Sequence, residues 1–454
     1  MSAVPSWGSA LQRWWSVPHR RWLGFVVLVA FALRAGWGLS VLVALPEMFE
    51  GGDQYGYVRY GREIAAGDGY VSYTTGTPTA YYPVGYPALL AGLFWLLAHT
   101  PLPDELPAAV AVLHAVLGAA TVGFVWLLAR RALGPVAGWV AAVVVAVHPD
   151  LIAYGSSYAL ETAFVAFALG ALAVLAGHDW ASGPPSSRRL LAFGLALGVA
   201  GLIRPFALPF LLALAGAVAA TGVGWRRCVR AVAVAGVAAV LVLTPWTVRN
   251  AVRLDAFVPI STNLGDTACM SRFVGSEGGF AWAAHEWCAD PTLPDVERSA
   301  ENLRLAAEFV RTHPAEELAL VGRRFTKMFG HGHSGLDEAE ASGRGPLPED
   351  VRRVAEGLSD AWFAFVLALG VPGVLLTLRR WREAPARALV AIPALVLLVI
   401  PLGLWGAPRF AMPLAPFLAV GVGATASAVA AAVGRRRLPL GPAPGPGPLA
   451  AGAG

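Results

Sequence analysis

Apolar runs of about twenty residues recur along the whole chain of 454 residues. A helix of that length crosses the roughly 30 Å hydrocarbon core of a bilayer. Hydrophobic residues make up 56% of the chain and its mean hydropathy is +0.59, which is too apolar for a soluble globular protein of this length. The sequence therefore predicts an all-α, polytopic membrane protein.

We predict about ten transmembrane helices and two extracytoplasmic loop regions. The apolar run at 83–98 is interpreted as an interfacial or re-entrant helix, because counting it as a span would place most later basic clusters on the wrong side of the membrane. The ten predicted spans lie near residues 22–45, 108–129, 134–149, 158–177, 190–203, 206–222, 229–246, 359–378, 387–405 and 410–433.

Arginine clusters between the spans give the predicted orientation. The net charge of +5 does not indicate nucleic-acid binding, because the arginines gather between apolar runs rather than along one stripe. With ten spans they all fall on one side, which the positive-inside rule makes cytoplasmic. The clusters are Arg20 and Arg21, Arg130 and Arg131, Arg188 and Arg189, Arg226 and Arg227, Arg379 and Arg380, and Arg435 to Arg437.

This orientation divides the chain into five parts. They are a cytoplasmic N-terminus (1–21), a transmembrane catalytic module (22–246) that includes a first outer loop (46–107), an extracytoplasmic loop domain (247–358), C-terminal transmembrane helices (359–433) and a disordered, Pro/Gly-rich cytoplasmic tail (434–454). Within the loop domain, apolar residues at helical spacing predict an amphipathic helix over 297–313.

The cysteines and histidines of the loop domain raise the possibilities of a disulfide and of a metal site. Cys269 and Cys288 could pair there in an oxidising compartment, and a bridge of that spacing would contribute roughly 3 kcal/mol, but the sequence is equally compatible with free thiols. His331 and His333 are too sparse a pattern to predict a zinc site, so we assign no metal ligands.

Five charged residues at the predicted outer ends of apolar helices are the candidate site, since each is costly in hydrocarbon unless paired or solvated. They are Asp53, Glu161, Arg204, Arg249 and Arg409. A carboxylate can accept a proton from a neutral nucleophile, and guanidinium groups stabilise the charge that develops on a departing phosphate. The set therefore predicts sugar transfer from a lipid phosphate.

Each of these residues also has a purely structural interpretation. Asp53 could be the N-cap of a helix from about 54 to 66, and Glu161 could only cap or solvate a helix end. The three arginines could anchor helix ends at lipid headgroups. Arg34, inside the first span, is expected to pair with another buried polar group or to reach the membrane interface rather than to bind substrate.

A set of motifs in fixed order resembles the GT-C membrane glycosyltransferases of the protein O-mannosyltransferase and aminoarabinose-transferase superfamily, over residues 20–430. The motifs are GDQYGYVRYGREIAAGDGY, YYPVGYPALLAG, PDLIAYGSSYALETAF, GLIRPF, TPWTVRNAVRLDAFVPISTNLGD and APRFAMPLAP. The resemblance implies an inverting transferase that takes a sugar from a polyprenyl-phosphate donor at the outer face of a prokaryotic cell membrane. The acceptor would be a lipid, a glycan or a protein.

The resemblance also implies roles for individual residues. Asp53 would be the catalytic carboxylate and Glu161 a second acidic residue, sometimes a metal contact, so a divalent cation is an optional cofactor. Arg204, Arg249 and Arg409 would bind the donor phosphate. The remaining substrate contacts would be Tyr55, Arg59, Tyr82, Tyr86 and Asn263.

Two features keep other interpretations open. Aminoarabinose transferases have an acidic residue and a lysine where this chain has Tyr81 and Tyr82, so aminoarabinose is not predicted as the sugar. The alternative of a transporter or lipid flippase would use the interrupted helix at Arg204 and Pro205, as such proteins use broken helices, although the sequence shows no internal repeat.

Overall fold

Apolar helices form nearly all of the regular structure, because backbone polar groups in hydrocarbon must be satisfied within their own segment. The structure is a computed structural model, and it describes residues 18–44, 52–72, 75–101, 106–281, 286–341 and 347–437. Within these ranges there is one isolated β-bridge, between Val71 and Pro78, and no strand. The predicted all-α, polytopic fold is confirmed.

Six helices are long and apolar enough to cross a membrane. They are α2 (Pro18–Ala44), α5 (Leu106–Leu133), α11 (Trp225–Leu254), α16 (Glu349–Arg379), α17 (Pro385–Leu402) and α18 (Ala415–Arg437), the last continuing the short turns η7 (Pro408–Phe410) and η8 (Met412–Leu414).

Proline lies at the breaks between α6 (Pro135–Ala146) and α7 (Pro149–Ala153) and between α9 (Ser187–Ile203) and α10 (Leu211–Ala220). The helix α6 bends by 53° into α7 and η1 (Tyr154–Ser156), and this pair could form a seventh span. Three shorter helices lie in the other predicted spans: α8 (Glu161–Ala176), α9 and α10, which follows the turn η3 (Pro205–Phe210). Each predicted span thus contains a helix, and the count of ten crossings stays a prediction.

Two membrane helices extend beyond their predicted ends into the segment assigned to the loop domain. The helix α11 continues to Leu254 and α16 begins at Glu349. The helix α2 already begins at Pro18, within the predicted N-terminal part (1–21), and α18 continues to Arg437, within the predicted disordered tail (434–454). The rest of these two parts, residues 1–17 and 438–454, lies outside the described residues.

Glycine allows the membrane helices to approach one another closely. A methyl group at Gly370 or Gly373 on α16 would overlap the backbone of α18 at Leu418 and Gly421. Gly194 on α9 faces the α11 backbone at Ala235 in the same way. Small residues at such crossings are typical of helix association in lipid, where close van der Waals packing replaces the hydrophobic effect.

The buried arginine of the first span ties three helices together. Arg34 donates from Nη1 to the carbonyl oxygens of Ala30 and Ala146, at 3.1 and 2.9 Å, and from Nη2 to that of Val145 at 2.8 Å. Its side chain also fills the space beside Gly118 on α5. The expectation that Arg34 pairs with buried polar groups is confirmed.

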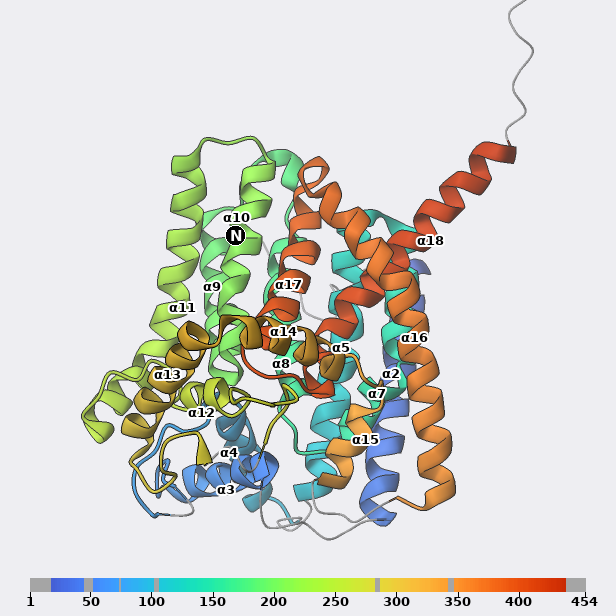
Figure 1. Cartoon of the computed structure of the whole chain (residues 1–454). Coiled ribbons are helices and arrows are strands. Elements are labelled where there is room, and N and C mark those ends of the chain that lie inside the picture. Colours follow the sequence, from blue (N-terminus) through green and yellow to red (C-terminus); the bar gives the residue numbers. More distant parts are fainter. Residues whose placement is uncertain are drawn as a thin grey trace, which may run out of the picture.

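The short helices gather towards one end of the bundle, the lower part of Figure 1. The arginine-rich ends, meaning the start of α11 at Trp225, the end of α16 at Arg379 and the end of α18 at Arg437, lie at the other. The short helices are α3 (Gly52–Ala66), α4 (Gly85–Ala98), α12 (Leu264–Cys269), α13 (Asp295–Thr312), α14 (Pro314–Met328) and α15 (Ser334–Ala339). Fourteen residues make α4 about 21 Å long, too short to cross a bilayer by itself.

The loop domain contains the predicted amphipathic helix and a disulfide. The helix is α13, in which Asn302 and Ala306 are buried while Leu303 and Val310 are each 41% exposed. The apolar stripe expected from the spacing is therefore largely exposed. Cys269 and Cys288 are bonded to each other, with 5.9 Å between their Cα atoms, which decides between the two alternatives that the sequence left open.

Candidate active site

A cavity of about 810 Å³ opens among the short helices, where segments far apart in the sequence converge. The start of α3, the turn between α9 and α10, the start of α15 and the turn before α18 all contribute to its wall. Asp53, Arg204 and Arg409 line it, and Glu161 lies directly behind Arg204. Four of the five charged residues singled out in the sequence therefore belong to one site.

Asp53 lies in the first turn of α3, where the partial positive charge of a helix N-terminus favours a carboxylate. Its Oδ1 accepts a hydrogen bond of 2.7 Å from the Tyr82 hydroxyl, and its Oδ2 lies 2.9 Å from Arg409 Nη2. Because α3 already begins at Gly52, Asp53 is not the N-cap of a helix that starts at residue 54. Its carboxylate is directed to side chains of the cavity instead.

The surroundings of Asp53 keep it ionised. Burial alone would raise the pKa of its carboxyl group, but the charge of Arg409 and the hydrogen bonds from Tyr82 and Arg409 outweigh this effect, and the pKa is lowered below its ordinary value. About one third of the side chain is exposed to the cavity. Asp53 is thus an accessible carboxylate that can accept a proton.

Arg409 also faces a second carboxyl group that sequence analysis did not single out. Its Nη1 lies 3.7 Å from Oε1 of Glu338 on α15, and Gln54 donates to the Oε2 and the backbone oxygen of Glu338 at 2.7 and 2.8 Å. Burial raises the pKa of Glu338 to about 7, although Arg409 acts against this shift. The pKa of Asp53 is therefore lowered, whereas that of Glu338 is raised.

Arg204 and Glu161 form a second ion pair, of 3.1 Å between Nη2 and Oε1, with the carboxylate side chain 3% exposed. Glu161 is the first residue of α8, and Arg204 follows the last residue of α9 immediately before Pro205. The guanidinium carbon lies 5.3 to 5.8 Å from the ring centroids of Phe164, Phe206 and Phe410. These aromatic faces exclude water and strengthen electrostatic interactions at the arginine.

Both arginines retain unused donors. Arg204 Nη1 and Arg409 Nε are buried and have no hydrogen-bond partner within the part of the chain that the structure describes. An unsatisfied buried N–H of a charged group is costly, and a phosphate oxygen would satisfy it. Asp53 and Glu161 are each engaged by a different guanidinium group, an arrangement that suits two cation–carboxylate pairs rather than one divalent ion shared between the carboxylates.

Arg249 is placed differently from the other two arginines. It lies outside the cavity lining and donates to the backbone oxygens of Thr79 and Tyr70 at 2.6 and 2.5 Å, while its guanidinium stacks 4.9 Å from the Trp246 ring centroid. It therefore fastens the segment between α3 and α4 to α11. Its assignment to the donor phosphate stays a prediction that this position does not support.

Two of the five predicted substrate contacts, Tyr82 and Asn263, line the cavity. The other three do not. Tyr55 is half-buried elsewhere on α3, Arg59 is exposed and pairs with Glu63 at 2.9 Å, and Tyr86 is fully buried with its hydroxyl 3.0 Å from His114 Nε2. Their predicted roles in substrate binding have no support from their positions.

Aromatic and polar residues other than the predicted substrate contacts complete the wall. Tyr57, Tyr81, Phe206, Trp405 and Phe410 line the cavity, with Gln54, Asp266 and Glu338 as additional polar groups. Asp266 accepts a 2.9 Å hydrogen bond from the Tyr81 hydroxyl. Aromatic rings beside a few convergent polar groups are typical of a small-molecule site.

Comparison with known proteins also indicates a polytopic membrane glycosyltransferase fold. Residues 88–248 match the family described as dolichyl-phosphate-mannose-protein mannosyltransferase. No curated protein matches the chain significantly.

Among solved structures, the chain is similar to the archaeal oligosaccharyltransferase AglB from Archaeoglobus fulgidus in complex with an inhibitory peptide and a dolichol-phosphate. The TM-score is 0.54 and the identity 15%, over 93% of this chain and 52% of AglB. The apo form of the Archaeoglobus fulgidus oligosaccharyltransferase gives a TM-score of 0.55 at 15% identity, over 92% and 51%. ArnT from Cupriavidus metallidurans bound to undecaprenyl phosphate gives 0.42 at 16% identity, over 91% and 79%.

The chain therefore has the GT-C fold of polytopic membrane glycosyltransferases. It spans about half the length of the archaeal oligosaccharyltransferase structures. Within it, residues 88–248 carry the pattern of the mannosyltransferase family.

Proposed function

We propose that this chain is a membrane glycosyltransferase that moves a sugar from a polyprenyl-phosphate donor to an acceptor hydroxyl, with inversion at the anomeric carbon. The observation that carries the proposal is the convergence of the Asp53 carboxylate with the guanidinium groups of Arg204 and Arg409 on one cavity. The dolichol-phosphate bound by AglB and the family described for residues 88–248 support a polyprenyl-phosphate donor.

The residues divide the chemistry between them. The donor phosphate would bind the unused donors of Arg204 and Arg409, which stabilise the negative charge that grows as the bond between the anomeric carbon and the phosphate oxygen breaks. The acceptor oxygen attacks the anomeric carbon from the opposite face, and its proton passes to Asp53. The products are the glycosylated acceptor and a polyprenyl monophosphate, which leaves with the electron pair of the broken bond.

Two observations support an extracytoplasmic site. The arginine-rich ends of α11, α16 and α18 lie at the opposite end of the bundle from the short helices around the cavity (Figure 1), and the positive-inside rule makes those ends cytoplasmic. The disulfide between Cys269 and Cys288 adjoins the cavity segment, and disulfides persist in oxidising compartments.

The test is a transfer assay with the full-length protein in proteoliposomes. Polyprenyl-phosphate donors carrying different sugars are supplied with a mixture of lipid, glycan and peptide acceptors, and release of the polyprenyl monophosphate is measured. We expect release that depends on the acceptor and on Asp53. Movement of intact donor lipid between leaflets without any release would overturn the proposal and favour the flippase alternative.

A further inference from the structure

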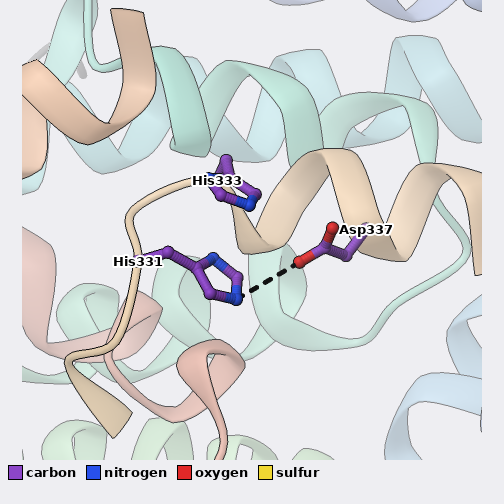
Figure 2. Close-up of side chains that lie close together, drawn as sticks. All are labelled: His331, His333 and Asp337. Carbon is purple, nitrogen blue, oxygen red and sulfur yellow. Dashed lines mark ion pairs between the residues drawn. The ribbon is translucent and has the colours of Figure 1, made fainter. Parts of the chain in front are cut away.

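A second group of potential ligands lies beside the cavity, in the segment between α14 and α16. His331 and His333 precede α15, and Asp337 lies within it (Figure 2). Figure 2 shows the two imidazole rings facing each other, with the Asp337 carboxylate directed at His331. One ligand atom from each residue lies within 4.8 Å of the others.

The spacing of these atoms is close to that of a metal site. His331 Nε2 is 3.6 Å from Asp337 Oδ2, and the two imidazole centroids are 4.0 Å apart. Ligands of a tetrahedral zinc ion with bonds of about 2.0 to 2.1 Å lie about 3.4 Å from one another. Small side-chain rotations would therefore bring the three ligand atoms onto one ion.

A carboxylate on α16 orients one of the histidines. Asp360 Oδ1 lies 2.9 Å from His333 Nδ1 and accepts a 2.7 Å hydrogen bond from the Gly332 backbone N–H. A His333 ring that donates its Nδ1–H to this carboxylate presents an unprotonated Nε2, the form in which histidine binds a metal ion. The same carboxylate–histidine contact orients the ligands of many zinc sites.

The remaining surroundings also fit a cation. The Asp337 side chain is 42% exposed, which leaves room for a water ligand. Arg352 approaches the other oxygen of Asp337 at 3.6 Å, but it is also engaged by Glu340 and Glu356.

We propose that His331, His333 and Asp337 bind one divalent metal ion of the zinc type, with water completing its coordination. Two imidazoles and one carboxylate are a ligand set that zinc accepts. The ion would fix α15 against the segment that precedes it. Asp337 lines the cavity and its neighbour Glu338 contacts Arg409, so the ion would position the cavity wall rather than take part in the proton transfer to Asp53.

The test measures metal binding directly, so that its outcome is independent of the proposed glycosyl transfer. Full-length protein purified through a tag without histidine is stripped with a chelator and titrated with zinc against a chromophoric competitor, and Co²⁺ is used as a spectroscopic probe. We expect one zinc ion per chain and the visible absorption of Co²⁺ with nitrogen and oxygen ligands. His331→Ala and His333→Ala should each lower the affinity at least about 100-fold, and Asp360→Asn about 10- to 100-fold.

Two variants serve as controls. His313→Ala removes an exposed histidine between α13 and α14 and should leave zinc affinity unchanged. Asp53→Asn should also retain the zinc, which separates this site from an ion held by the cavity carboxylates. Thermal unfolding of each variant checks that it is folded, and Asp337→Asn offers a milder change if a histidine variant is not. No stoichiometric zinc uptake by the wild type, or wild-type affinity in the histidine and Asp360 variants, would overturn the proposal.

Discussion

Asp53→Asn is the most direct test of the site, because it removes the charge and the proton acceptor while keeping the shape of the side chain. The amide oxygen can still accept the Tyr82 hydroxyl hydrogen bond, whereas Arg409 loses its 2.9 Å carboxylate partner and retains the more distant Glu338 at 3.7 Å. The substitution therefore separates the chemical role of Asp53 from its packing.

The expected loss follows from the role of a general base. A positioned base contributes about 10²- to 10⁴-fold to a rate, which corresponds to about 2.7 to 5.4 kcal/mol of activation free energy. The effect of Asp53→Asn on the free energy of unfolding should be much smaller than its effect on the activation free energy. The side chain of Asp53 is about one third exposed, and ion pairs open to solvent contribute at most about 1 kcal/mol. Turnover should therefore fall by orders of magnitude while the variant remains abundant and folded.

The assay is single-turnover release of polyprenyl monophosphate from the preferred donor, with protein abundance and the unfolding temperature measured in parallel. The matched control is Asp68→Asn, an exposed aspartate just after α3 in the same outer loop, and its transfer rate should stay within about twofold of the wild type. A normally abundant Asp53→Asn variant that transfers sugar at the wild-type rate would refute the assignment of Asp53 as the base.

Four further predictions follow from the same contacts. Arg204→Lys should raise KM for the donor about tenfold or more, because lysine cannot present the planar group that meets both its carboxylate partner and a phosphate; an unchanged KM would exclude this arginine from donor binding. Arg249→Ala should lower the unfolding temperature but leave KM of the surviving protein unchanged, since its donors hold backbone oxygens. The pKa of Asp53 is lowered, so its contribution to rate and stability is fully present at any pH above the ordinary pKa of an aspartate and is lost only as the pH falls through the lowered pKa. A fall in rate between pH 7 and pH 5 whose midpoint shifts in Asp53→Glu would contradict this. Cys288→Ser opens the bond to Cys269 and should cost about 3 kcal/mol of unfolding free energy, and a stability change below about 0.5 kcal/mol on denaturant unfolding would argue against the bridge.

The fold was predictable because lipid imposes a simple constraint on sequence. Every predicted span contains a helix, since apolar runs in a bilayer have few other ways to satisfy their backbones. Orientation then places charged residues at one end of the bundle, which is why Asp53 and Arg409 could be grouped although α3 and the turn before α18 lie at opposite ends of the sequence. Hydropathy determines the end of the bundle at which a residue lies, but not the direction of its side chain.

The predicted site residues that lie away from the cavity, and the cavity residues that were not predicted, both reflect that limit. Arg249 and Arg204 are both arginines at helix ends, but the segment that packs beside Arg249 offers it backbone oxygens. No local sequence pattern predicts the path of that segment. Glu338 is one of many acidic residues in the loop domain, and only the fold of α15 brings it to Arg409. Of the proposed metal ligands, Asp337 follows His333 by four positions, one helical turn, but this spacing alone was too sparse to predict a site.

The bonds of Arg34 also bear on the order in which the membrane domain can be assembled. The arginine lies in the middle third of α2, where an unpaired guanidinium costs about 2.5 to 3.5 kcal/mol during insertion. Its acceptor at Ala146 is 112 residues further along the chain, which a ribosome at about 5 to 20 residues per second needs roughly 6 to 22 s to add. We therefore expect α2 to remain beside the translocon until α6 emerges, so that α2 settles in lipid later than its early place in the chain would suggest.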